Sequence, residues 1–520
     1  MFKRIYSKIR PFHFVLLIPF FLLHVTNFYF GLLPQNVVIK SIIAYSALCI
    51  SLFLFSKVFL KDNNKIGVFA FVSLGYFFGF GSVKDFLETF PSLHKLTSYR
   101  YFLSIIALML FLLFIYLKTT TRDLRRLNNF LFLAVTVNFL LELVLFSRNV
   151  ITHAELKNDL GDPNLTAVKA FTPCTNCNQP DIFFIIFDEY TSSDCLKKYW
   201  HYSNDTLDNY LHENKFFISE KSRSNYCFTT FSLSSILEMQ YLNLPEGYTQ
   251  AIAKDFGRGE FTVMNNTTIK ILEKQGYSIH NHSIFNFEDH PTLIGTYFYQ
   301  LRGMYLDDET LFGRVKRDIA WNFGAFFVKD VEKKVKESIA EKADRQVQYN
   351  SYSFNLAKNA IKNQAPDKKD FFYFHFLLPH DPFVFDAKGN VKYYTDFRSD
   401  IREKYLEQLK YTNTLLIDLV NYIQKQYNRK AVIIVQGDHG FKEWPGEENY
   451  KDIAFQNLNA IFLPDTTYTG YYDGVSSVNT FRLLFNHYFN TSFDILPDKS
   501  IQVYIKPELK KNYGIRQKNN

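Results

Sequence analysis

The chain has 520 residues and a formal net charge of +8, and this length allows more than one domain, since domains usually hold roughly 100–200 residues. The polar part of the sequence contains no dense Lys/Arg block or basic stripe, which argues against nucleic acid as a partner. The average composition conceals two halves, because residues up to about Phe146 form long apolar runs and the rest is mixed and charged.

Five apolar runs in the first half predict membrane-spanning helices, each near the roughly 20 residues that a hydrocarbon core requires. The predicted spans are residues 13–33, 37–60, 66–83, 101–117 and 129–146. The third contains four glycines, which favour close helix packing. The first follows four basic residues but lacks a small-residue cleavage site and precedes further spans, so we expect a retained helix rather than a signal peptide.

Basic residues lie on alternate sides of these spans. Four precede the first span, Lys61 and Lys65 follow the second, and four more lie between Lys118 and Arg126, whereas the first outer loop has none. The positive-inside rule therefore places the N-terminus in the cytoplasm, and five spans place everything after Phe146 outside it. Glu142 is the one clear acid within a span. It either faces a path for a lipid substrate or reaches interfacial water near the helix end.

Residues 1–146 thus form the predicted transmembrane domain, and residues 147–180 a polar linker with one or two short helices. The linker contains Cys174 and Cys177 as a C-x-x-C motif. In an oxidising compartment we favour a local disulfide. Two free thiols are an alternative, and a metal site is a weaker one because no second C-x-x-C completes a zinc ligand set.

Three continuous apolar runs follow the linker, at Asp181–Phe187, Asp370–Leu378 and Lys430–Gln436. Such runs fit strands buried on both faces of a parallel sheet. Helical stretches such as Thr268–Gln275 and Tyr405–Gln426 separate them. The alternation predicts a three-layer α/β domain with a mostly parallel central sheet over residues 181–500, followed by a C-terminal tail at 501–520.

Acidic and histidine residues stand directly after each run: Asp188 and Glu189, then His380, then Asp438 and His439. The carboxyl ends of parallel strands meet at one edge of a sheet, and these side chains offer the oxygen and nitrogen ligands of a divalent metal. Each residue alone has an ordinary structural explanation, such as a turn or a helix cap. Their joint occurrence in this order favours a metal site.

A further segment, SNYCFTTFSL, begins at Ser224 and precedes a helix predicted from about Phe231 to Leu242. Thr229 would then lie near the helix N-terminus, where backbone N–H groups and the helix dipole favour an alkoxide and a bound phosphate. Plain N-capping by Thr229 or Thr230 is the alternative, and spacing alone does not choose between them.

Taken together, Asp188-Glu189-Tyr190, SNYCFTTFSLSSIL, PHDPF and GDHG resemble the motifs of the alkaline phosphatase superfamily. The branch with the greatest resemblance contains membrane-anchored, sulfatase-like proteins such as the lipoteichoic acid synthases and phosphoethanolamine transferases. These proteins also place five spans before an extracytoplasmic catalytic domain. The resemblance therefore implies a multi-pass protein of the bacterial inner membrane with its catalytic domain in the periplasm.

The resemblance implies a role for each matched residue. Asp188, Asp438 and His439 match the metal ligands, and Thr229 matches a nucleophile that also contacts the metal. His439 stands where calcium-binding sulfatases have Asn, and an imidazole suits Zn²⁺ or Mn²⁺ better than Ca²⁺ or Mg²⁺. The C/S-x-P-x-R motif of hydrolytic sulfatases is absent from the sequence, which argues against their chemistry.

His380 matches a histidine that contacts the transferred or leaving group. Glu189 takes the place of a second acidic residue of sulfatases, and Thr230 is the alternative nucleophile. We expect a metal-dependent phosphotransferase that moves a phosphoethanolamine or phosphoglycerol type of head group from a phospholipid donor to an envelope glycan or glycolipid. The segment Phe441–Asn449 lacks the further His usual in phosphoethanolamine transferases. A sulfatase-like hydrolase and a non-catalytic envelope membrane protein are the alternatives.

Overall fold

The computed structural model describes residues 10–152, 159–162, 165–244, 250–293, 305–319, 331–362, 369–393, 400–443 and 449–505. The chain divides into two compact units. The first unit comprises residues 1–158 and 299–329, and the second comprises residues 159–298 and 330–520. Within residues 299–329, the structure describes 305–319. A segment from the globular half of the sequence therefore belongs to the same unit as the N-terminal helices.

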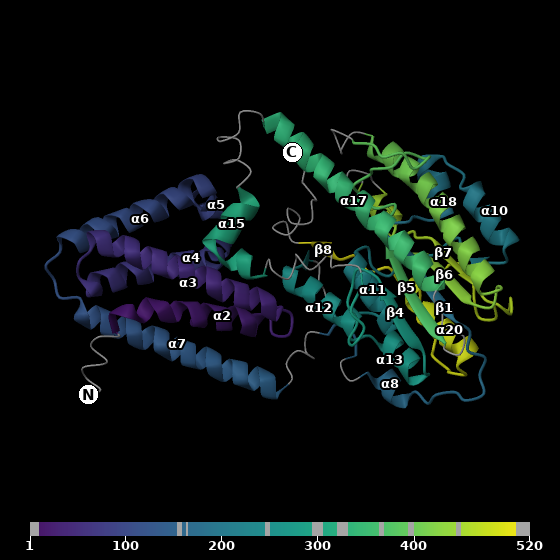
Figure 1. The fold of residues 1–520 in the computed structure, drawn as a ribbon, viewed down its shortest axis with the longest axis horizontal. Helices are drawn as coiled ribbons and strands as arrows, with labels where there is room; N and C mark the ends of the chain where they lie inside the picture. The colour runs from purple at the N-terminus through teal and green to yellow at the C-terminus, as the bar shows by residue number, and fades with distance from the viewer. Residues whose placement is uncertain are drawn as a thin grey trace. The chain divides into compact units, whose positions relative to one another are not determined.

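Five helices of the first unit are long and apolar enough to cross a membrane, as predicted (Figure 1). They are residues Arg10–Phe28, which comprise η1 (Arg10–Leu16) and α2 (Leu17–Phe28), then α3 (Gln35–Phe59), α4 (Asn63–Glu88), α6 (Tyr99–Thr119) and α7 (Arg125–Ile151). Helix α4, the third span, begins earlier and ends later than its predicted apolar run. At its start, Asp62 accepts a hydrogen bond from the Asn64 backbone N–H. Apolar runs locate spans, but capping and polar end residues set where the helices stop.

Helix α4 is the most buried of the spans that follow the first, which agrees with the close packing expected from its glycines. A Cβ on Gly67 would lie 2.3 Å from the Pro11 carbonyl oxygen, and one on Gly81 would lie 2.2 Å from that of Asp308. Gly75 and Gly79 have open space instead. Two of the four glycines therefore permit close approach of another backbone.

The helix ends that carry the predicted cytoplasmic residues lie together. Arg10 donates to the Asn129 side chain at 3.2 Å, and the Lys65 ammonium donates to the Thr120 carbonyl at 2.7 Å. The first bond joins the start of the first span to the start of α7, and the second joins the start of α4 to the connection between α6 and α7. The first, third and fifth spans therefore run in the same direction, as the predicted alternation requires.

Glu142 connects two spans. Its carboxylate accepts a hydrogen bond from the Asn27 side chain at 2.7 Å and lies 2.8 Å from Nδ1 of His24. The Asn27 amide also donates to the Glu142 carbonyl at 2.8 Å. Neither a lipid path nor interfacial water is needed to explain an acid at this position in a span, because α2 supplies the partners of the Glu142 carboxylate. The carboxylate stabilises the contact between α2 and α7.

The second unit is built on a six-stranded sheet with the strand order β2-β7-β6-β1-β5-β4. The strands are β1 (Ile182–Phe187), β2 (Phe217–Ile218), β4 (Ser278–His282), β5 (Asp370–Phe376), β6 (Val432–Gly437) and β7 (Asn459–Phe462). Strands β6, β1, β5 and β4 are parallel, and β7 and β2 pair antiparallel at one edge. The three predicted runs are the three central strands, and every residue of them is buried.

Successive side chains of β1 enter two different cores, because strand side chains alternate between faces. Phe183, Ile185 and Phe187 pack with α10 (Asp205–Glu213), α17 (Val331–Lys362) and α18 (Ile401–Gln426). Ile182, Phe184 and Ile186 pack with α11 (Thr229–Glu238), α13 (Thr267–Lys274) and α20 (Thr480–Tyr488) (Figure 1). The predicted three-layer α/β fold with a mostly parallel sheet is confirmed.

The linker is fixed to this domain. It contains α8 (Thr166–Ala170), and Cys174 and Cys177 form a disulfide, the arrangement favoured from the sequence. The Cys174 backbone N–H donates to the Gln275 side chain at 2.9 Å, and that side chain donates back to the Cys174 carbonyl at 2.8 Å. The disulfide loop is thereby held against the C-terminal end of α13.

Replacing Glu142 by Leu should destabilise the membrane unit by about 1 kcal/mol, since polar contacts between membrane helices have roughly that strength. His24 and Asn27 would lose their shared partner. Thermal unfolding in mild detergent measures the effect. The matched control is Asn138→Leu, because Asn138 is exposed on the same helix and its side chain donates to the Ala134 carbonyl within that helix. An equal loss in both variants would contradict the assigned contact.

Candidate active site

The three central strands end side by side. Phe187 at the end of β1 is paired in register with Phe376 of β5 and with Gly437 of β6. The Asp188 backbone N–H extends this ladder by donating to the Phe376 carbonyl at 3.0 Å. The residues that follow each strand are therefore delivered to one edge of the sheet, as predicted from their order in the sequence.

Asp188, Asp438 and His439 form a buried cluster in which one ligand atom of each lies within 4.8 Å of the others. Nε2 of His439 is 3.4 Å from Oδ2 of Asp438 and 3.7 Å from Oδ1 of Asp188. Neither of these carboxylate oxygens has a hydrogen-bond partner in the described structure, although both are buried. Buried acceptors without a donor are costly, and a divalent cation would satisfy both at once.

His439 is oriented for this purpose. Its Nδ1 lies 2.8 Å from the Gly440 carbonyl oxygen, which can only accept a hydrogen bond, so Nδ1 carries the proton. Nε2 therefore presents its lone pair to the carboxylates, as in histidines that bind metals. Burial lowers the pKa of His439 to about 4, which keeps the imidazole neutral at physiological pH.

Neighbouring groups hold the two carboxylates. The Glu189 backbone N–H donates to Oδ1 of Asp438 at 3.0 Å. Nε2 of His375 lies 3.6 Å from the second oxygen of Asp188. Burial opposes ionisation of Asp188, but the nearby imidazoles of His380 and His375 outweigh it and lower its pKa. His375 is not predicted as a site residue from the sequence, because it lies inside an apolar strand, where a single histidine has no distinguishing signal.

Thr229 is the first residue of α11, two residues earlier than the predicted start. Its hydroxyl lies 3.4 Å from Nε2 of His439, next to the cluster. The N-cap position is occupied by Phe228, and no side chain caps the helix, so capping does not explain either threonine. The methyl group of Thr230 instead lies against Gly259, where an added Cβ would come within 2.7 Å. Of the two threonines, Thr229 is therefore the one beside the buried ligands.

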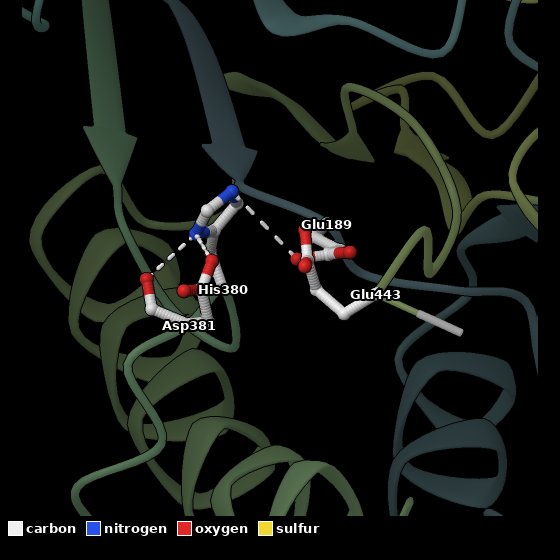
Figure 2. A group of neighbouring side chains, drawn as sticks. All are labelled: Glu189, His380, Asp381 and Glu443. Atoms are coloured by element: carbon white, nitrogen blue, oxygen red, sulfur yellow. Dashed lines mark hydrogen bonds and ion pairs between the residues drawn. The ribbon is translucent and has the colours of Figure 1, made fainter. Parts of the chain in front are cut away.

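His380 belongs to a second cluster with Glu189, Asp381 and Glu443. Figure 2 shows His380 with Asp381 on one side and the two glutamates on the other. Its Nδ1 is 2.9 Å from Oδ1 of Asp381, and its Nε2 is 3.7 Å from Oε2 of Glu189. Burial disfavours a charged His380, but Asp188, Asp381 and Glu189 outweigh it and raise its pKa well above the ordinary value. Burial also raises the pKa of Glu189 to about 8.

Lys442 lies between the two clusters. Its ammonium is 2.9 Å from Nε2 of His439 and 3.5 Å from Nε2 of His380. Burial opposes its charge, but Glu189 and Asp188 outweigh this effect and raise the pKa of Lys442. The Lys442 ammonium therefore offsets part of the negative charge of the buried carboxylates beside His439. The sequence gives little reason to predict Lys442 as a site residue, since a lysine three residues after a histidine is common on surfaces.

Comparison with known proteins supports the motif-based resemblance. Residues 246–462 match the Sulfatase family model, a range that includes His380, Asp438 and His439 but neither Asp188 nor Thr229. No curated protein matches the sequence. Residues 246–462, which lie in the globular half of the chain, are thus sulfatase-like.

Several solved structures are similar to the chain. The C-terminal periplasmic domain of phosphoethanolamine transferase EptC from Campylobacter jejuni is 13% identical, covers 65% of this chain and 100% of its own, and has a TM-score of 0.35. The corresponding domain of EptC from Escherichia coli is 12% identical, with coverages of 64% and 90% and a TM-score of 0.36, and it has also been solved in complex with Zn. The lipoteichoic acid synthase LtaP from Listeria monocytogenes is 11% identical, with coverages of 65% and 80% and a TM-score of 0.32.

If the first cluster holds a metal ion, Asp438→Asn should remove it, because a neutral amide replaces a carboxylate whose second oxygen otherwise has no partner. The metal content of the purified full chain, measured by elemental mass spectrometry, should then fall from one equivalent of zinc or manganese to almost none. Asp386→Asn is the control, since that carboxylate bonds to Lys388 and Asn390 in a loop away from the cluster. A full equivalent of metal in Asp438→Asn would contradict the assignment.

Proposed function

We propose that this chain is a metal-dependent phosphotransferase of the bacterial inner membrane that uses Thr229 as its nucleophile. One observation carries the proposal: a threonine hydroxyl at a helix N-terminus lies 3.4 Å from the histidine of a buried three-residue ligand cluster. The donor would be a phospholipid, and the acceptor would be an envelope glycan or glycolipid. The transferred unit would be a phosphoethanolamine or phosphoglycerol type of head group.

Asp188, Asp438 and His439 would hold the metal, and their donor set of carboxylates and imidazole favours Zn²⁺ or Mn²⁺ over Ca²⁺ or Mg²⁺. A bound divalent ion supplies positive charge that lowers the pKa of a nearby hydroxyl and offsets charge on the phosphoryl oxygens. The neutral state of His439 and the ionised state of Asp188 are the forms that ligands must take.

The chain's own residues account for the two displacements. In the first, the Thr229 hydroxyl loses its proton to water, and the resulting alkoxide forms a bond to phosphorus as the ester bond to the lipid alcohol breaks. His380, charged because of its acidic neighbours, donates its proton to the departing oxygen. In the second, the acceptor hydroxyl returns its proton to His380, attacks phosphorus and releases Thr229. Lys442, beside both histidines, offsets the negative charge of the phosphoryl oxygens.

Hydrolysis on the same scaffold is the second candidate, and the match to the Sulfatase family favours it. Water would then replace the acceptor in the second displacement. The absence of the C/S-x-P-x-R motif from the sequence argues against sulfate esters as the substrates. A non-catalytic envelope protein is disfavoured, because one buried oxygen each of Asp188 and Asp438 has no hydrogen-bond partner among the described residues, and the neighbouring groups offset only part of that cost.

The proposed location has two supports. Basic residues gather at one set of helix ends, which the positive-inside rule assigns to the cytoplasm. The disulfide between Cys174 and Cys177 fits an oxidising compartment such as the periplasm. The globular unit would then face the periplasm.

Incubating the full chain with envelope lipids should leave an adduct on Thr229. Peptide mass spectrometry would identify both the site and the mass of the transferred group. Thr230→Ala is the control and should keep the adduct, whereas Thr229→Ala should lose it. An adduct on Thr230 in the unaltered chain would reject Thr229 as nucleophile. A tagged donor lipid that labels an acceptor distinguishes transfer from hydrolysis.

His380→Gln should slow turnover of a phospholipid by about 10²- to 10⁴-fold, the usual contribution of a general acid. It should hardly affect a p-nitrophenyl phosphodiester, whose leaving group needs no proton. In the unaltered enzyme the protonated His380 is the active form, so lipid turnover should persist below its raised pKa and fall as the pH rises through it. This alkaline decline should disappear in His380→Gln. Equal slowing of both substrates would argue against proton donation.

A further inference from the structure

Residues 305–319 lie between two parts of the globular domain in sequence but pack against the membrane helices. In Figure 1, α15 (Leu311–Asp318) lies beside α4 and α5 (His94–Thr97). The ring of Tyr305 stacks on Tyr29 with 4.5 Å between centroids. Ser82 donates to the Glu309 carboxylate at 2.6 Å. This segment therefore has specific partners on more than one span.

The partners all lie at the same level of the bundle. Tyr29 follows α2, Asp85 is in the last turn of α4, and Tyr99 is the first residue of α6. Asp85 forms an ion pair with Arg314, and the Tyr99 hydroxyl donates to the Arg314 carbonyl at 3.5 Å. These are the helix ends opposite to those joined by Arg10 and by Lys65. The segment thus lies where the spans leave the hydrocarbon on the side away from the basic connections.

The contact is closely packed. Gly81 of α4 lacks the side chain that would collide with the Asp308 backbone of the segment. The Arg314 side chain is only 7% exposed. Leu311 packs against the apolar cluster that contains Phe80. Such a fit belongs to a permanent part of the membrane unit.

The remaining face of α15 has the character of a membrane surface helix. Phe312 is 64% exposed, and Lys316, one turn later, is also exposed. Phe86 in the last turn of α4 and Phe90 just after this helix are exposed as well. Aromatic rings beside basic groups at the ends of spans are typical of the head-group layer, where the ring enters the boundary of the acyl chains and the ammonium meets lipid phosphates.

We infer that α15 is a membrane-interface contact, with Phe312 inserted into the head-group layer of the bilayer that holds the five spans and Lys316 at the level of the phosphates. The globular half of the chain is then connected to the membrane twice, through the linker after α7 and through this returning segment. The inference requires no particular chemistry at the active site, so it stands or fails separately from the proposed phosphotransferase.

Spin labelling of the full chain tests this inference. A nitroxide is attached to Phe312→Cys, and the chain is placed in nanodiscs of phosphatidylethanolamine and phosphatidylglycerol. The ratio of its collisions with oxygen to its collisions with a water-soluble nickel chelate should be severalfold higher than the same ratio for the free label. A label on Val144→Cys, a residue exposed on span α7, gives the value for lipid. If Phe312→Cys does not fold, Lys316→Cys should report protection from the chelate at the head-group level. Chelate access equal to that of the free label at the position measured would overturn the inference.

Discussion

Burial of several carboxylates at one edge of a parallel sheet is the constraint on which the globular half of this protein depends. Asp188, Glu189 and Asp438 are all almost completely buried, and an uncompensated buried charge costs several kcal/mol. The chain offsets part of this cost with Lys442 and a charged His380. One oxygen each of Asp188 and Asp438 still lacks a hydrogen-bond partner among the described residues, and the natural shared partner of these two oxygens is a cation. The chemistry proposed for Thr229 follows from its position beside that site.

The layered fold makes this arrangement possible. Strands β1, β5 and β6 are buried on both faces, so their polar end residues leave the sheet at one edge instead of along its faces. Helix α11 packs on one face and begins at this edge, which brings Thr229 to His439. The two side-chain clusters are distinct but adjacent, with Lys442 in contact with a histidine of each. The proposed metal binding and proton donation would therefore fall to neighbouring groups.

The helices of the membrane half make specific contacts with one another, beyond the apolar composition that a membrane anchor requires. Polar contacts at the basic helix ends and the Glu142 contact between α2 and α7 fix its helices. The docking of residues 305–319 on α4 adds a piece of the globular sequence to the same unit. An enzyme that takes its donor from a bilayer gains from such a connection, because the protein and the lipid then share the same surface.

The sequence by itself determined the features that depend on local pattern. Hydrophobic length identified five spans, continuous apolar runs identified the three central strands, and the residues after those runs identified most of the candidate site. The tertiary structure alone decided which side chains meet. It placed Thr229 rather than Thr230 at the cluster and put His380 in a second cluster. It also added Lys442, and it returned residues 305–319 to the membrane helices. These outcomes depend on helix phase, strand register and contacts between distant segments, none of which leaves a periodic signal in the chain.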